Sequence, residues 1–168
     1  MTPLNLTIRP AAPSDAPALR ELMAQLGYPA DAVELARRLA LVLASPGHAV
    51  LVAVIDDQPV GLAHVALLPL LEDEGSAHLL ALVVDEAHRS RGLGAHLVAA
   101  VEAWAAGAGA PRVVVRSNIV RTRTHAFYER LGYVRTKTQL NLRKPLPAAF
   151  AQAYRRLHRA LERVVHLF

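Results

Sequence analysis

The segment Asp85–Gly94 has the residue types of an anion-binding turn. It follows an apolar run, and a helical pattern begins within its two glycines. The first amides of a helix have no partners inside the helix and carry partial positive charge, so they suit a phosphate. Gly92 and Gly94 let an anion approach the backbone, while Arg89 and Arg91 add forked donors for phosphate oxygens. The alternative is that the glycines only permit a tight turn or close packing.

A second segment, Phe127–Tyr133, carries Tyr128, whose phenol has a proton to give near neutral pH. Together the two segments resemble the GNAT superfamily of acetyltransferases. In that family, an Arg or Gln, two residues, a Gly, one residue and a Gly or Ala bind the cofactor pyrophosphate, and an aromatic-Tyr-Glu-Lys-x-Gly-Phe segment follows. Arg89, Gly92 and Gly94 match the first pattern. The resemblance covers roughly Leu4–Arg143, and the ordered pair of motifs is more specific than either motif alone.

The resemblance implies an acetyl-CoA-dependent N-acetyltransferase that acetylates a primary amine of a small molecule or peptide, by direct attack in a ternary complex. It implies that the backbone near Leu82–Val84 binds the pantetheine arm and polarises the thioester carbonyl. The expected fold is α/β (α+β), a mixed and mostly antiparallel sheet flanked by about four helices, with an extra C-terminal helix. The expected cofactor-binding residues are Leu82, Val83, Val84, Arg89, Ser90, Arg91, Gly92, Leu93, Gly94, Asn118 and Tyr128.

Two departures from the family pattern affect the expected cofactor site. Many members carry an asparagine seven residues before the tyrosine, and here that position is Arg121. Asn118 either takes over the contact with the pantetheine arm or only caps the following turn. Tyr133–Arg143 is also short for the family's last two strands, so the seventh strand is either brief or supplied by a partner chain.

Acetyl transfer to an amine needs a neutral amine held against the thioester and a proton for the departing thiolate. Tyr128 matches the family's tyrosine and is the expected proton donor. His78 is the expected base, with His64, Glu74 or a water molecule as alternatives, because histidine titrates near neutral pH. A lone strand histidine is also often a structural residue with hydrogen-bond partners. The scattered histidines do not form a metal-site pattern, so no metal is expected.

The composition of the 168-residue chain limits the other function classes. The net charge is +5, but Lys137 and Lys144 are the only lysines, and a phosphate-rich cofactor accounts for the arginines as well as nucleic acid does. There is no cysteine, which excludes disulfides, cysteine metal ligands and cysteine nucleophiles. We expect a cytoplasmic protein with no nucleic-acid or membrane partner, since no signal peptide or membrane-length apolar run is present. The alternatives are a non-catalytic acyl-CoA-binding module and an Arg-rich nucleic-acid-binding protein.

Hydrophobic periodicity predicts the elements that position these residues. Strands are expected at Leu4–Arg9, Ala49–Ile55, Pro59–Leu68, His78–Val84 and Val113–Val115, with further extended chain over Tyr133–Arg143. Helices are expected from about Ser14 or Asp15 (one of them the cap) to Leu26, from Asp31 to a stop at Ser45–Gly47, from the Gly92–Gly94 turn to a break at Gly107–Pro111, and from about Thr122 to Leu131. Residues 1–146 form the expected acetyltransferase domain. Residues 147–168 form an amphipathic helix that packs on the same domain or makes a homodimer contact.

Overall fold

The computed structural model describes residues 5–147 of the chain. Within this range there are five strands, four α-helices and two short 3-10 turns. The strands are β1 (Leu6–Pro10), β2 (His48–Ile55), β3 (Gln58–Leu67), β4 (Ala77–Val84) and β5 (Val113–Val115). The helices are α1 (Ala16–Leu26), α2 (Ala32–Ala44), α3 (Leu93–Gly107) and α4 (Thr122–Arg130), and the 3-10 turns are η1 (Pro13–Asp15) and η2 (Glu86–His88).

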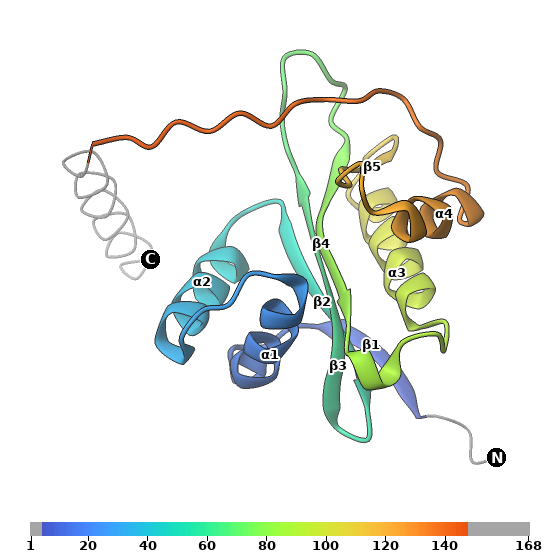
Figure 1. Cartoon of the computed structure of the whole chain (residues 1–168). Helices are drawn as coiled ribbons and strands as arrows, with labels where there is room; N and C mark the ends of the chain where they lie inside the picture. Colours follow the sequence, from blue (N-terminus) through green and yellow to red (C-terminus); the bar gives the residue numbers. More distant parts are fainter. Residues whose placement is uncertain (1–4, 148–168) are drawn as a thin grey trace. The chain divides into compact units, whose positions relative to one another are not determined.

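The strands form one mixed sheet in the order β1-β2-β3-β4-β5. Strands β1 to β4 pair antiparallel with one another, and β5 runs parallel to β4. Figure 1 shows α1 and α2 on one face of this sheet and α3 and α4 on the other. This mostly antiparallel sheet with four described helices confirms the fold class predicted from the sequence.

A hydrophobic cluster on each face holds the layers together. Leu19 of α1 and Leu39 of α2 pack with Val52 of β2 on one face. Leu97 of α3 packs with Ala53 of β2 on the other face. Neighbouring residues of one strand belong to opposite clusters because successive side chains of a strand point to opposite faces of the sheet.

Strand β4 contains a bulge that the sequence did not predict. His64 of β3 lies opposite Ala81, and the next residue, Val65, lies opposite Leu79. Leu80 is therefore an extra residue without a partner on β3, as in a β-bulge. The continuous apolar run His78–Val84 is typical of a strand covered on both faces, but Leu80 is 45% exposed at the bulge.

The bulge changes which side chains of β4 face α3. Ala77 and Leu79, before the bulge, belong to the cluster under α3, and after it Leu82 and Val84 pack against the same cluster. Strand β5 pairs with β4 only at Ala77–Leu79. Beyond the bulge, the side of β4 turned away from β3 has no strand neighbour among the described residues, so its backbone groups are open to another partner.

Of the four described α-helices, only α2 begins with a side-chain cap. The Asp31 carboxylate accepts a hydrogen bond from the Glu34 amide at 2.8 Å, which confirms the predicted cap of α2. Asp15 occupies the cap position of α1, as predicted, but its side chain makes no cap bond to the helix. The Asp15 carboxylate accepts instead from the Ala12 amide and from the two terminal guanidinium nitrogens of Arg9, at 2.7–2.8 Å. Asp15 thus stabilises the 3-10 turn before α1.

The chain divides into two compact units, Met1–Tyr133 and Val134–Phe168. Of the second unit, residues 134–147 are described, and they contain no helix or strand. The extended segment predicted from Tyr133 to Arg143 therefore forms no strand in the described range. Apolar alternation is present, but a strand needs a hydrogen-bonded neighbour, and Leu140 and Leu142 are exposed. The predicted helix over 147–168 lies almost entirely outside the described residues.

Candidate active site

The turn between β4 and α3 has the anion-binding form expected from its residues. Helix α3 begins at Leu93, after Gly92 in the left-handed conformation (φ 79°). The amides of Gly92, Leu93 and Gly94 make no hydrogen bond to an acceptor within the described residues, whereas the Ala95 amide already bonds to the Gly92 carbonyl. Three adjacent backbone donors are therefore available at the positive end of a 15-residue helix.

The two positions of this turn require glycine for different structural reasons. Gly92 has a positive φ, a backbone conformation that residues other than glycine rarely adopt. Gly94 has ordinary helical geometry, but a Cβ there would lie 3.3 Å from the Phe127 ring. The alternative interpretation, close packing, thus holds for Gly94, and it fixes the start of α3 against α4.

The two arginines of the turn also differ. Arg89 donates from Nε to the Val84 carbonyl at 3.0 Å and lies 3.4 Å from the Glu86 carboxylate, so it braces the turn internally. Arg91 forms no ion pair with a carboxylate of the described residues, and its charge is available to a ligand. Of the two, Arg91 is better placed to supply positive charge to a phosphate.

Gln25 of α1 holds the beginning of the turn, a role that the sequence did not indicate. Its amide nitrogen donates to the Asp85 carboxylate at 2.9 Å, and its amide oxygen accepts from the Glu86 backbone at 3.0 Å. Asp85 also accepts from the Ala87 amide, and Nδ1 of His88 lies 3.0 Å from its carboxylate. These contacts lower the pKa of Asp85, with the Gln25 hydrogen bond as the largest cause. No periodicity or motif marks a lone glutamine on a helix, so only the fold reveals it.

We expect Gln25→Ala to weaken acetyl-CoA binding while leaving the chemical step nearly unchanged. Two exposed hydrogen bonds that preorganise the turn are lost, which corresponds to a rise in Kd of about three- to tenfold. Calorimetric titration with CoA measures the Kd, and kcat at saturating acetyl-CoA checks the chemistry. Arg20→Ala on the same helix, which removes only a surface pair with Glu21, is the matched control. An unaltered Kd in Gln25→Ala would contradict this role.

Tyr128 lies on α4, in the same hydrophobic cluster as Leu82 and Val84 of β4. The helix ends in a Schellman motif, in which Gly132 donates to Glu129 and Tyr133 donates to Tyr128. The Tyr128 ring makes edge contacts with neighbouring aromatic rings and is 7% exposed. Burial raises the pKa of its phenol to about 12, opposed by the positive charge of Arg121. Tyr128 is therefore a protonated phenol beside the open end of β4.

His78 is buried at the beginning of β4, and neither ring nitrogen has a hydrogen-bond partner among the described residues. Its pKa is lowered, first by burial and then by the positive charge of Arg116, while Asp73 opposes these effects. A neutral imidazole with two unpaired nitrogens costs about 1–3 kcal/mol of solvation free energy per unpaired group, and this cost is offset when a ligand or water bonds to it. The hydrogen-bonded structural role that we considered for this histidine is therefore not observed.

The other two candidate bases already have partners. Nε2 of His64 lies 3.0 Å from Nδ1 of His48, and burial followed by the charge of His48 lowers the His64 pKa to about 4. Glu74 is exposed and lies 3.7 Å from the Arg112 guanidinium. His64 and Glu74 are therefore both engaged by other side chains, and His78 is the candidate that the structure leaves most available.

Asn118 has the local role that we considered as an alternative. Its side-chain oxygen accepts from the Val120 amide at 3.1 Å, and its carbonyl accepts from the Arg121 amide at 3.0 Å. It thus shapes the turn before α4. Only its side-chain nitrogen is left for a ligand, since no partner for this nitrogen is found in the described part of the chain.

Residues 5–147 contain neither a metal-binding cluster nor a membrane-spanning helix. No group of three or more histidine or acidic side chains is arranged to hold a metal ion. No helix is both long and apolar enough to cross a membrane.

Comparison with known proteins identifies the family. A model described as the acetyltransferase (GNAT) family matches residues 16–133, well over half of the chain. The chain belongs to this family. It is an N-acetyltransferase that uses acetyl-CoA, and the resemblance based on the turn and the tyrosine segment is confirmed.

The relatives of this acetyltransferase include enzymes named for aminoglycosides. It is 32% identical over 145 residues to the aminoglycoside N(6')-acetyltransferase type 1 of Stenotrophomonas maltophilia, covering 83% of this chain and 94% of the relative. It is 25% identical to an acetyltransferase of Trypanosoma brucei, with a TM-score of 0.72 and coverage of 83% and 100%. An aminoglycoside N-acetyltransferase solved with CoA shares the fold, with a TM-score of 0.77, 20% identity and coverage of 87% and 100%.

Proposed function

We propose that this acetyltransferase transfers the acetyl group of acetyl-CoA to a primary amine of a small molecule or peptide, in a ternary complex of both substrates. The observation that carries this proposal is the edge of β4 from Leu80 to Val84, which has no strand neighbour among the described residues and is open apart from the Val84 carbonyl that accepts from Arg89. This edge ends at the amide-rich turn before α3 and shares a hydrophobic cluster with Tyr128. It provides backbone donors, a phosphate site and a phenol in one region.

The described residues fit acetyl-CoA, which supplies an activated acetyl thioester. The amides of Gly92, Leu93 and Gly94, with the charge of Arg91, suit its pyrophosphate. The backbone of Leu82–Val84 can pair with the amide-containing pantetheine arm as it would with a neighbouring strand. The side-chain nitrogen of Asn118 is a further donor. Arg89 and Ser90 contribute by shaping the turn, in which Ser90 has a φ of 63°.

The chemistry requires two proton transfers at named atoms. A bond forms between the amine nitrogen and the acetyl carbon, and the bond from that carbon to sulfur breaks. His78, neutral near pH 7, accepts the proton that the amine loses, directly or through one water molecule. The phenol of Tyr128 gives its proton to the departing sulfur. Backbone amides at the free edge of β4 stabilise negative charge on the acetyl oxygen without reorganising.

A thiol-release assay over an amine panel tests this function. We expect acetyl-CoA-dependent CoA release that is stimulated by at least one primary amine and matched by an N-acetylated product in mass spectrometry. The panel includes amino acids, dipeptides, polyamines and aminoglycosides. Binding of acetyl-CoA with no amine-stimulated release across the panel would contradict the proposed reaction.

A further inference from the structure

Two arginines close to His78 and Tyr128 are not used by the acetyl-transfer chemistry. Arg116 follows β5, in which Val114 lies opposite His78. Val113 and Val115 pack with the cluster under α3. Because side chains alternate along a strand, Arg116 is on the other face, which is the face of His78.

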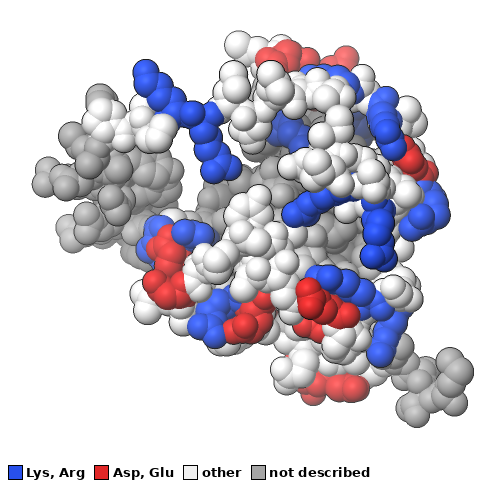
Figure 2. All heavy atoms as spheres, in the orientation of Figure 1, with Lys and Arg blue, Asp and Glu red and all other residues white. Residues whose placement is uncertain are grey.

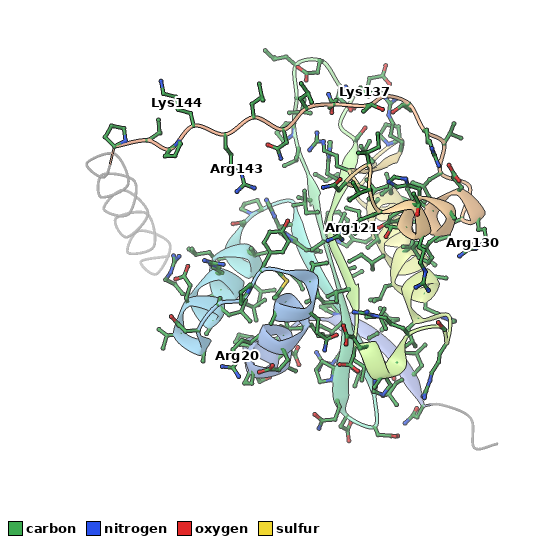
Figure 3. The ribbon with its side chains drawn as sticks, in the orientation of Figure 1. Arg20, Arg121, Arg130, Lys137, Arg143 and Lys144 are labelled. Carbon is green, nitrogen blue, oxygen red and sulfur yellow. The ribbon has the colours of Figure 1, made fainter. Side chains whose placement is uncertain are left out.

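Arg121 is the second of these arginines. It precedes the first residue of α4, the helix that carries Tyr128 two turns later. Figure 3 shows Arg121 near β4, whereas Arg130 lies at the outer end of α4. The charge of Arg121 acts on the Tyr128 phenol, and the charge of Arg116 acts on the His78 ring. One cation is therefore close to each of the two groups to which we assign proton transfer.

Neither arginine forms an ion pair with a carboxylate of the described residues, and both are exposed. Most described carboxylates are already paired with a base or a backbone amide elsewhere, and Figure 2 shows acidic side chains mostly beside basic ones on the face in view. The carboxylates bonded to arginines are Asp15, Glu21, Glu34, Asp73, Glu74 and Glu86.

The acidic residue that acts on His78, Asp73, is not available to a cationic acceptor. Its carboxylate accepts hydrogen bonds from the hydroxyl and the amide of Ser76 at 2.8–3.1 Å and lies 3.8 Å from the Arg112 guanidinium. Asp56 and Asp57 form the β2–β3 turn at positive φ, away from the β4–β5 pairing. Glu72, in the exposed loop before β4, has no such partner in the described range, but β4, β5 and the segment that leads into α4 offer positive charge and no unpaired carboxylate.

From this arrangement we propose that the acceptor carries a carboxylate close to its amine, and that Arg116 and Arg121 bind this carboxylate. The proposal rests on the acetyl-transfer function and specifies its substrate class as amino acids or peptides with a free carboxylate. A guanidinium presents paired donors that match a carboxylate, so it would orient the acceptor as well as attract it. A polycationic amine would instead meet like charge on both sides of the reacting groups.

The experiment compares matched acceptors in the thiol-release assay. Amino acids and dipeptides are each measured beside their C-terminal carboxamides, with neamine as the polycationic probe. We expect kcat/KM for the carboxylate member to exceed that for its carboxamide by about ten- to a hundredfold, the size of a charge-assisted hydrogen-bond contribution. Equal or faster turnover of carboxamides or neamine would overturn the inference and leave the proposed function standing.

Variants assign the preference to the two arginines. Arg116→Ala and Arg121→Ala should each raise the acceptor KM about tenfold and reduce the preference for the carboxylate, with an unchanged KM for acetyl-CoA. Arg116→Lys should keep part of the preference, and Arg130→Ala should leave it intact. If Arg121→Ala raises the KM for acetyl-CoA instead, Arg121 serves the cofactor and the proposal is wrong for it.

Product binding separates this inference from failure of turnover. Titration of the CoA complex with an N-acetylamino acid and with its carboxamide reports the charge preference without chemistry. We expect about tenfold tighter binding of the carboxylate form, lost in Arg116→Ala. Tighter binding without turnover would contradict only the acetyl-transfer function, whereas equal binding would contradict the carboxylate site.

Discussion

Tyr128→Phe is expected to lower kcat by about a hundredfold or more, the usual contribution of a positioned general acid, with little change in the Kd for acetyl-CoA. The substitution removes the phenol proton but keeps the ring, whose edge contacts with Phe127 and Tyr133 have centroid distances of 5.1 and 5.4 Å. Burial raises the phenol pKa to about 12, so the proton is present throughout the neutral range. Single-turnover rates with acetyl-CoA bound in advance measure the chemical step directly.

Tyr133→Phe is the matched control for this experiment. Its hydroxyl donates to the Glu102 carboxylate at 3.0 Å, so this phenol is engaged outside the proposed chemistry. We expect its turnover to stay within about twofold of wild type, with a loss of stability of about 1 kcal/mol from the removed hydrogen bond. Unchanged turnover in Tyr128→Phe, or an equal loss in both variants, would refute the assignment of Tyr128 as the proton donor.

The sequence predicted the glycine turn and the helix that begins in it because their signals are local. A buried strand, a glycine with positive φ and the beginning of an amphipathic helix follow one another within ten or so residues. The type of each residue limits its backbone there, so the position of the start of α3 at Leu93 could be predicted. The role of Gly94 could not, because it depends on Phe127, which approaches from a different helix.

The features that the sequence did not predict depend on contacts between distant segments. The bulge at Leu80 is a change of register between β3 and β4, and an uninterrupted apolar run looks the same with or without it. Gln25 contacts Asp85 across about sixty residues of chain. The alternation over Tyr133–Arg143 predicted a strand, but no partner strand is present in the described range. Local patterning therefore identifies the donors of the turn, and tertiary packing decides how β4 presents its free edge.

The same limit applies to the choice of base. The sequence favoured His78 and kept His64, Glu74 or a water molecule as alternatives, since each side chain is a titratable group near the expected site. The structure distinguishes them by their partners, which are His48 for His64 and Arg112 for Glu74. His78 lacks such a partner among the described residues.

His78→Ala is expected to lower kcat/KM by about a hundredfold at pH 7.5, because the amine then loses its proton without a positioned base. The pH dependence gives the sharper test. Burial and Arg116 lower the His78 pKa below 6.5, so the neutral, basic form is present above that value and is lost as the pH falls through the lowered pKa. The wild-type kcat/KM should therefore have an acidic limb with its midpoint below pH 6.5. The limb should disappear in His78→Ala, leaving only the titration of the amine.

His64→Ala and Glu74→Ala are the controls that separate the three candidates. If His78 is the base, both variants should keep the acidic limb and lose no more than about threefold in kcat/KM, because neither side chain accepts the amine proton.

Thermal denaturation of each variant at pH 7.5 checks that the fold is retained, and His78→Gln gives a version with a polar, non-basic side chain of similar size. Partial recovery of His78→Ala by added imidazole would support proton transfer, since imidazole restores the base but not a packing contact. An acidic limb that persists in His78→Ala and disappears in His64→Ala would move the base to His64, where the wild-type midpoint should then lie near pH 4.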